Sequence, residues 1–241
     1  MSEWKQKRFW TDAAAVQADG GWAVHLDGRA VKTPAKVGLI LPTRALADAV
    51  AAEWDAQDDV VNPTAMPFTR SANAAIDKVA VQHGEVADML AAYGDADLLC
   101  YRADAPDELV QRQADTWDPY LDWAAETFRA RLHPRTGVMH ESQDANALQA
   151  LSECVHALSD FELAAFHDLV SLSGSLVLGF AAAQDLNPTP TIWAASRLDE
   201  LWQEEQWGPD EEAQEVADIK KHSFLHAKSF FDAAQRLSEQ P

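Results

Sequence analysis

The pattern of apolar residues changes near residue 84, and this change limits what the chain can fold into. Before Gly84, short alternating segments mix with helical ones, whereas beyond it apolar residues recur mainly at the spacing of an α-helix. With 241 residues, the chain is long enough for one large domain or two small ones. The sequence therefore predicts an α+β protein, with a small N-terminal domain of strands and helices over residues 1–85 and a larger all-helical domain over residues 86–241.

Short apolar stretches in the first third indicate a small sheet. Residues 22–26 alternate between apolar and other side chains, and the Asp27-Gly28 pair that follows is typical of a two-residue hairpin turn. A return strand over residues 29–33 stops at Pro34, and residues 39–41 read as a third short strand. We expect a hairpin and one further strand here.

Two helices are expected after these strands. Thr43 can cap the N-terminus of a helix that ends near residue 56. Its apolar side chains recur every four residues and share one core-facing stripe, formed by Leu46, Val50 and Trp54. A second helix is expected over residues 69–84.

Helices separated by proline and glycine should fill the rest of the chain. A helix with Pro106 in its first turn is expected to break at Asp118-Pro119, where another begins. The capping box from Ser159 to Glu162 predicts a long apolar helix that continues to residue 183. Small residues recur along it at a spacing of four, which favours close packing of another helix and a central place in a bundle: Ser171, Ser175 and Gly179.

The charge excludes several classes of partner. The chain has 19 basic and 39 acidic residues and a formal net charge of −20. A strongly acidic surface is unsuited to binding nucleic acid or an anionic membrane, and it favours a monomer through repulsion between copies. The longest apolar run, residues 169–183, is shorter than the about 20 residues that span a bilayer, and the N-terminus lacks the apolar core of a signal peptide. We therefore expect a cytoplasmic protein without membrane insertion.

The sequence contains no recognised catalytic or metal-binding motif. Glycine-rich phosphate loops, a G-x-S-x-G elbow and H-E-x-x-H are all absent. His222 and His226 have helical metal spacing, but neighbouring lysines disfavour a cation there. Cys100 and Cys154 suggest buried thiols, although Cys100 could also be a nucleophile. We expect no catalytic residue, no metal and no cofactor.

Tryptophan, the residue type most enriched in binding hot spots, occurs nine times. On a helix over residues 190–206, one face would gather Ala194, Ala195, Leu198, Leu201 and Trp202. The other would gather Trp193, Arg197, Glu200, Glu204 and Trp207, as either an exposed partner-binding stripe or a second packing face. Residues 199–218 carry nine acidic side chains and no basic one, which fits either a solubilising surface or a contact zone for a partner with basic groups.

Four stretches of the chain resemble the family of assembly chaperones that handle the α subunit of the ATP synthase catalytic head. The first, residues 21–57, is GWAVHLDGRAVKTPAKVGLILPTRALADAVAAEWDAQ, and the second is MPFTR over residues 66–70, followed by Asn73 and Asp77. The third joins residues 98–101 to DELVQRQADTWDPYLDW (107–123), and the fourth is DELWQEEQWG (199–208). The likeness keeps its order and spacing over nearly the whole chain.

This resemblance implies a chaperone that works without catalysis or ATP. Such a protein would hold the free α subunit and mask the surface that later pairs with the β subunit. The family pattern matches at Glu200, Gln203, Trp207 and Gly208 and at Trp54 and Asp55, whereas Leu201 stands where an acidic residue is expected. The partner-binding residues predicted from the resemblance and the helical faces are Glu200, Trp207, Gln203, Trp193, Glu204, Trp54 and Asp55. Two other hypotheses are a small hydrolase or transferase with a scattered site, and a regulatory binding module.

Overall fold

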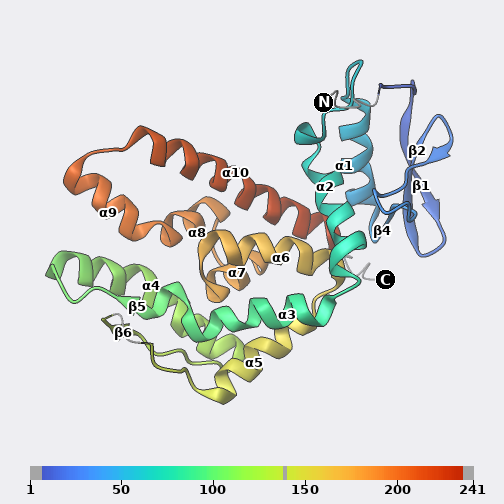
Figure 1. Cartoon of the computed structure of the whole chain (residues 1–241). Coiled ribbons are helices and arrows are strands. Elements are labelled where there is room, and N and C mark those ends of the chain that lie inside the picture. Colours follow the sequence, from blue (N-terminus) through green and yellow to red (C-terminus); the bar gives the residue numbers. More distant parts are fainter. Residues whose placement is uncertain (1–6, 138–139, 236–241) are drawn as a thin grey trace. The chain divides into compact units, whose positions relative to one another are not determined.

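The structure, a computed structural model, describes residues 7–137 and 140–235 (Figure 1). The chain divides into two compact units. The first unit consists of the N-terminal part up to His83 together with residues 159–165 and the C-terminal part from Ser229, and the second consists of residues 84–158 and 166–228. The sequence predicts one boundary near residue 85; the structure adds that two later segments belong with the first unit.

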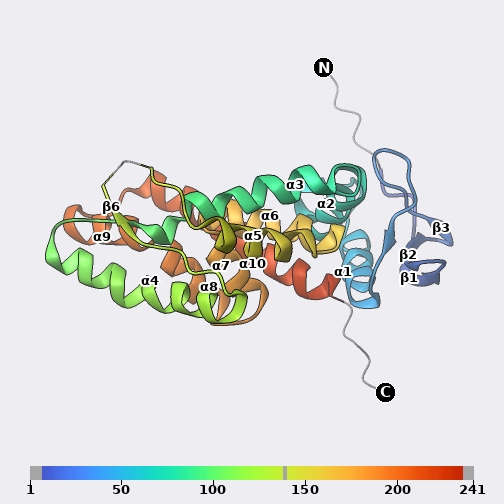
Figure 2. The same ribbon diagram turned by 90° about the horizontal axis from the view of Figure 1, so that it is seen from below.

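The first unit contains a small antiparallel sheet centred on β2 (Gly21–Leu26). β1 (Ala13–Ala18) pairs along the whole of β2, from Ala13 opposite Leu26 to Ala18 opposite Gly21. β3 (Arg29–Ala30) pairs with the C-terminal end of β2 (Figure 2), and β4 (Ile40–Leu41) pairs with its N-terminal end (Figure 1). Asp27 and Gly28 both have positive φ, 46° and 79°, which is the conformation of a two-residue hairpin turn. The predicted hairpin is confirmed. β1 is not predicted from the sequence, because its residues do not alternate between apolar and polar side chains.

Helix α1 (Arg44–Asp55) packs on β1 and β2 and forms the core of the first unit. The Thr43 hydroxyl accepts a hydrogen bond from the Leu46 amide, as a capping residue should. Leu46 and Val50 are fully buried, which confirms the predicted apolar stripe. α2 (Pro67–Ala74) follows and continues through a π-helical turn over Ala75–Val79.

The second unit is built of helices and one two-residue strand pair, β5 (Tyr101–Arg102) parallel to β6 (Arg135–Thr136). α7 (Leu176–Ala183) is its most buried element, with every residue buried. The other helices are α3 (His83–Ala91), which begins at the end of the first unit, α4 (Asp107–Phe128), α5 (Ala145–His156), the later part of α6 (Asp160–Ser173), α8 (Thr189–Ser196), α9 (Leu198–Trp207) and α10 (Glu211–Ala234) up to residue 228. The α+β class and the mostly helical C-terminal part are confirmed. Among the described residues, no helix is both long and apolar enough to cross a bilayer.

The long helix predicted over residues 159–183 is wrong, because it is two helices. The capping box that begins it is confirmed, since Glu162 accepts from the Ser159 amide at 2.8 Å. The break comes at Gly174, whose φ of 72° ends α6, and Ser175 caps α7. Close packing explains Gly179, where a Cβ atom would lie 2.6 Å from the Cγ2 atom of Val170.

A buried carboxylate fixes the start of α7. Asp97 is fully buried and accepts hydrogen bonds from the Ser175 hydroxyl at 2.7 Å and from the Val177 and Leu99 amides at 3.0 Å. Burial raises the pKa of Asp97 to about 6, against the lowering effect of these hydrogen bonds. At neutral pH the residue is therefore a buried anion at the positive end of a helix.

Two further predicted helix boundaries are corrected. α4 continues through Pro119, where a break is predicted. Proline removes one backbone hydrogen bond, but Trp117 and Tyr120 on either side of it are buried, and the Trp117 indole donates to the Ala195 carbonyl at 2.8 Å. The single helix predicted over residues 190–206 breaks at Arg197, whose backbone angles of −107° and 14° separate α8 from α9.

Candidate partner-binding site

The exposed apolar side chains of α9 and of the first turns of α10 lie within the most acidic part of the chain. We call residues 199–219 the α9–α10 surface (Figure 1). Its exposed apolar residues are Trp207 (80% exposed), Ile219 (62%), Val216 (47%) and Leu201 (41%). Nine acidic and no basic side chains occur over residues 199–218, so this stretch of chain is strongly acidic. Basic groups lie at its edge, since Arg197 and Lys220 line a hollow together with Val216. Such a surface suits a partner that is apolar at its centre and basic around it.

Two of the four carboxylates on α9 are neutralised by arginines. Arg197 pairs with Glu200 at 2.7 Å, and Arg112 pairs with Glu205 at 2.9 Å. Arg112 also lies over the Trp202 ring, 4.9 Å from its centre, and its hydrogen bond lowers the pKa of the Glu205 carboxyl. In the part of the chain that the structure describes, Asp199 and Glu204 have no cationic partner.

A groove of about 570 Å³ lies beside this surface, entirely within the second unit. It is lined by residues of α9, of β5 and the segment after it, of the start of α4, and by Gly137. Gln113 is only 1% exposed and connects two sides of the groove. Its side-chain oxygen accepts a hydrogen bond from the Ala103 backbone amide, and its side-chain nitrogen donates to the Asp199 carboxylate at 2.7 Å. The α9 side chains in the groove are Asp199, Trp202, Gln203 and Trp207.

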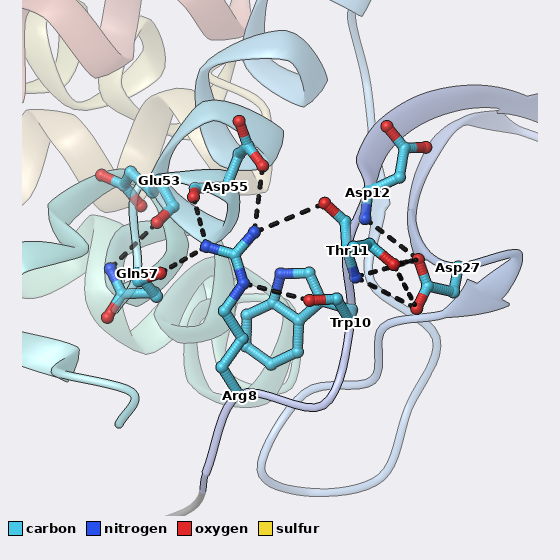
Figure 3. Close-up of polar contacts among 8 residues, drawn as sticks. All are labelled: Arg8, Trp10, Thr11, Asp12, Asp27, Glu53, Asp55 and Gln57. Atoms are coloured by element: carbon cyan, nitrogen blue, oxygen red, sulfur yellow. Dashed lines mark hydrogen bonds and ion pairs between the residues drawn. The ribbon is translucent and has the colours of Figure 1, made fainter. Parts of the chain in front are cut away.

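The EWDAQ block has an intramolecular role in the first unit (Figure 3). Arg8 hydrogen-bonds the backbone carbonyls of Asp55 and Gln57 and forms an ion pair with the Asp55 carboxylate at 3.3 Å. The Trp54 ring packs edge-on against the buried Trp10 ring, with 5.2 Å between their centres. These contacts attach the segment before β1 to the end of α1.

Glu53, in the same block, caps another helix. Its carboxylate accepts from the Phe68 and Thr69 amides at 2.6 and 2.8 Å and from the Thr69 hydroxyl at 2.7 Å. The Gln57 side chain closes the loop between α1 and α2 by accepting from the Asn62 amide at 2.7 Å. The block therefore positions α2 against α1.

The described residues offer little for catalysis. No three His, Cys, Asp or Glu side chains among them lie close enough to hold a metal ion. The ring of His222 hydrogen-bonds the Asp218 carbonyl at 2.7 Å, one turn earlier in α10. Cys100 is buried, and burial raises the pKa of its thiol to about 12, which is opposite to what a nucleophile requires.

Comparison with known proteins identifies the family. A family model described as "ATP12 chaperone protein" matches residues 7–125. The solved structure of Atp12 from Paracoccus denitrificans is 48% identical to this chain, with a TM-score of 0.94 over 97% of this chain and 100% of that one. The chain belongs to the ATP12 chaperone family. A point mutant of the Paracoccus protein gives a TM-score of 0.95 at the same identity and coverage. The mitochondrial protein atp12 of Schizosaccharomyces pombe is 26% identical over 226 residues, which is 87% of this chain and 76% of that relative.

Membership of the ATP12 family confirms the resemblance drawn from the sequence. A chaperone, rather than an enzyme, is the class of protein that the family contains. The hypothesis of a small hydrolase or transferase is therefore not supported.

Six of the seven predicted partner-binding residues fall into three places. Gln203 and Trp207 line the groove, while Glu200 and Glu204 are half-buried on the same helix. Trp54 and Asp55 lie in the first unit and make the contacts described above. Their roles toward a partner stay predictions.

The expectation that Trp193 lies on an exposed stripe with Trp207 is wrong. Trp193 is only 6% exposed, and its ring packs 5.5 Å from that of Phe224. The break at Arg197 puts the two tryptophans on different helices, so the helical spacing that joins them does not apply. Of the two interpretations of that stripe, a second packing face holds at Trp193. Leu201, expected to pack beside Leu198, is instead exposed.

The sequence missed the groove itself. Tyr101, Gln113 and Asp199 come from three separate segments, and no spacing in the chain relates them. The density of tryptophan and acidic residues after residue 198 was a signal for its α9 wall only.

Proposed function

We propose that this chain assists ATP synthase assembly by binding the free α subunit of the catalytic head through the α9–α10 surface, until the β subunit displaces it. The observation that carries the proposal is Trp207, which ends α9 with 80% of its surface exposed. Tryptophan buries a large apolar area when a partner covers it, and it is the residue type most enriched in binding hot spots. The cytoplasmic location expected from the sequence belongs to the same proposal.

The chemistry of an unassembled ring subunit fits this surface. Such a subunit exposes an apolar interface of the obligate kind, which aggregates when left uncovered. Trp207, Val216 and Ile219 offer apolar contacts, and the carboxylates around them can pair with basic groups on the partner. The net charge of −20 keeps the complex dispersed and favours a monomeric free chaperone.

Release needs no nucleotide in this scheme. The β subunit forms a larger permanent interface with the α subunit, and so it competes for the masked surface with a greater buried area. The chaperone then leaves by mass action. Suppression of α-subunit aggregation without ATP, followed through light scattering, tests this step: aggregation at the same rate with and without the chaperone contradicts it.

A pull-down with purified α subunit tests the surface. Trp207→Ala removes the exposed anchor, and Glu204→Lys reverses a carboxylate that has no cationic partner among the described residues. We expect each variant to weaken binding by about 30-fold, the equivalent of a 2 kcal/mol hot spot. Val81→Ala is the matched control, because Val81 is equally exposed but lies in the first unit. If both variants keep the wild-type circular dichroism spectrum and still bind as well as Val81→Ala does, the surface is assigned wrongly.

A further inference from the structure

We propose that the groove beside α9 receives an arginine side chain of the partner protein, stacked on tryptophan and paired with Asp199. This inference deepens the proposed function, on which it rests for the source of the arginine. The groove itself is defined by α9, the start of α4 and the β5 segment.

Asp199 carries a negative charge that no cation among the described residues balances. Its carboxylate accepts a hydrogen bond from the neutral amide of Gln113 at 2.7 Å. Glu200 and Glu205 on the same helix are each paired with an arginine. Asp199 is therefore a half-buried anion that lines a groove and is held in place by a buried amide.

Aromatic rings line the same groove. Trp202, Trp207 and Tyr101 all contribute to the groove. The faces of aromatic rings attract cations, and tryptophan does so best. Trp202 already binds one guanidinium in this way, because Arg112 lies 4.9 Å from its ring centre. A carboxylate among indole rings is an arrangement that recognises a cation.

Arg102 lines the groove but does not pair with the Asp199 carboxylate. Arg102 is bound elsewhere, with its guanidinium on Asp118 at 2.7 Å and its Nε atom on the Leu99 carbonyl at 2.7 Å. It also lies over the ring of Trp117. Its positive charge is thus balanced, and the carboxylate of Asp199 remains for an incoming group.

Geometry favours a guanidinium over an ammonium. A guanidinium is planar, so it can stack on an indole while its N–H groups donate in its plane to a carboxylate. An ammonium is more strongly hydrated and binds as a point charge. The acidic residues around the groove attract either cation, but only the planar guanidinium is also stabilised by stacking on an indole ring.

Titration of the full chain with N-acetyl-arginine amide tests the inference. The readout is the NMR signals of the Trp202 and Trp207 indole N–H groups, assigned with Trp→Phe variants. We expect saturable shifts with a dissociation constant of ~1–10 mM, in the range of a single cation–π contact with an ion pair. N-acetyl-citrulline amide, which is neutral and nearly isosteric, should cause no saturable shift, and N-acetyl-lysine amide should bind several-fold more weakly.

Variants connect these shifts to the groove. Asp199→Asn keeps an oxygen that can accept from Gln113 but removes the charge, and it should weaken arginine binding about tenfold. Trp207→Leu should weaken it about threefold. Asp218→Asn is the matched control, because Asp218 is exposed on α10 in the same acidic segment and does not line the groove. Equal shifts with citrulline, equal affinity for lysine, or no effect of Asp199→Asn would each overturn the inference.

The result can be separated from that of the proposed function. If arginine amide binds as expected but purified α subunit is not captured, the proposed partner is wrong while the specificity of the groove holds. If wild type and Asp199→Asn capture the α subunit equally and arginine amide fails to bind, the proposed function survives and the arginine site does not.

Discussion

Glu53 should stabilise the fold by capping a helix to which it does not belong. An α-helix leaves its first four N–H groups without intrahelical partners. In α2, the amide of the N-cap residue Met66 donates to the Pro63 carbonyl, Pro67 has no N–H group, and the amides of Phe68 and Thr69 donate to Glu53. The carboxylate of Glu53 therefore satisfies every remaining donor of the first turn, and it also accepts from the Thr69 hydroxyl.

The cost of removing this carboxylate follows from the donors it leaves. Loss of one capping acceptor costs about 1 kcal/mol, and loss of a negative charge at a helix N-terminus costs about 0.5 kcal/mol more. Glu53→Ala removes the acceptor of two amides and should lower the free energy of unfolding by about 2–3 kcal/mol. Glu53→Gln keeps one oxygen and should cost about half as much.

Urea denaturation followed by circular dichroism measures the loss, and amide hydrogen exchange locates it. We expect the Phe68 and Thr69 amides to exchange faster in both variants. Glu126→Gln is the control, because Glu126 is exposed on α4 and its side chain has no hydrogen-bond partner among the described residues. Glu53→Ala within about 0.5 kcal/mol of wild type, with both amides still protected, would refute the capping argument.

Two other predictions concern stability. Because burial raises the folded-state pKa of Asp97 from 3.8 to about 6, its contribution to the free energy of unfolding is largest below pH 4 and falls by about 3 kcal/mol as the pH rises through 6. About 1 kcal/mol of that loss falls between pH 5 and 7, which is above the isoelectric point of about 4.6. Urea titrations over this range should therefore show the free energy of unfolding of wild type falling by that amount relative to Asp97→Asn. A difference between the two proteins that does not change with pH would contradict this. Gly21→Ala would place a Cβ atom 2.2 Å from the Leu41 carbonyl oxygen and should disrupt the pairing of β2 with β4. Its thermal midpoint should therefore fall well below that of Gly38→Ala, whose φ is not positive and whose Cβ would come no closer than 3.8 Å to the Ile40 side chain; equal midpoints would show that the sheet edge relaxes freely.

Local chemistry accounts for the parts of the fold that were predicted correctly. The turn at Asp27-Gly28, the cap at Thr43 and the box at Ser159 each need only residues within a few positions of one another. Such contacts form in almost any surroundings, so their sequence patterns are dependable.

The boundaries that were predicted wrongly depend on packing. Pro119 ordinarily ends a helix, yet buried neighbours hold α4 together through it. Gly174 and Arg197 end helices whose apolar spacing alone would let them continue. Whether a helix continues through such a residue is decided by what its side chains meet on other helices.

The candidate site could likewise be predicted only in part from the sequence. The tryptophans and carboxylates of α9 could be identified from the sequence, because composition and family resemblance both point to residues 199–208. The groove could not, because Asp199 meets Gln113 across 86 positions of the chain.

The sequence by itself determined the family, the acidic character of the surface and the local turns and caps, since each is a property of neighbouring residues or of composition. Only the tertiary structure decided that Trp193 is buried while Trp207 is exposed, and that Glu53 caps α2. Burial and long-range hydrogen bonds depend on which segments meet in space, and that is a property of the whole packed chain rather than of any stretch of it.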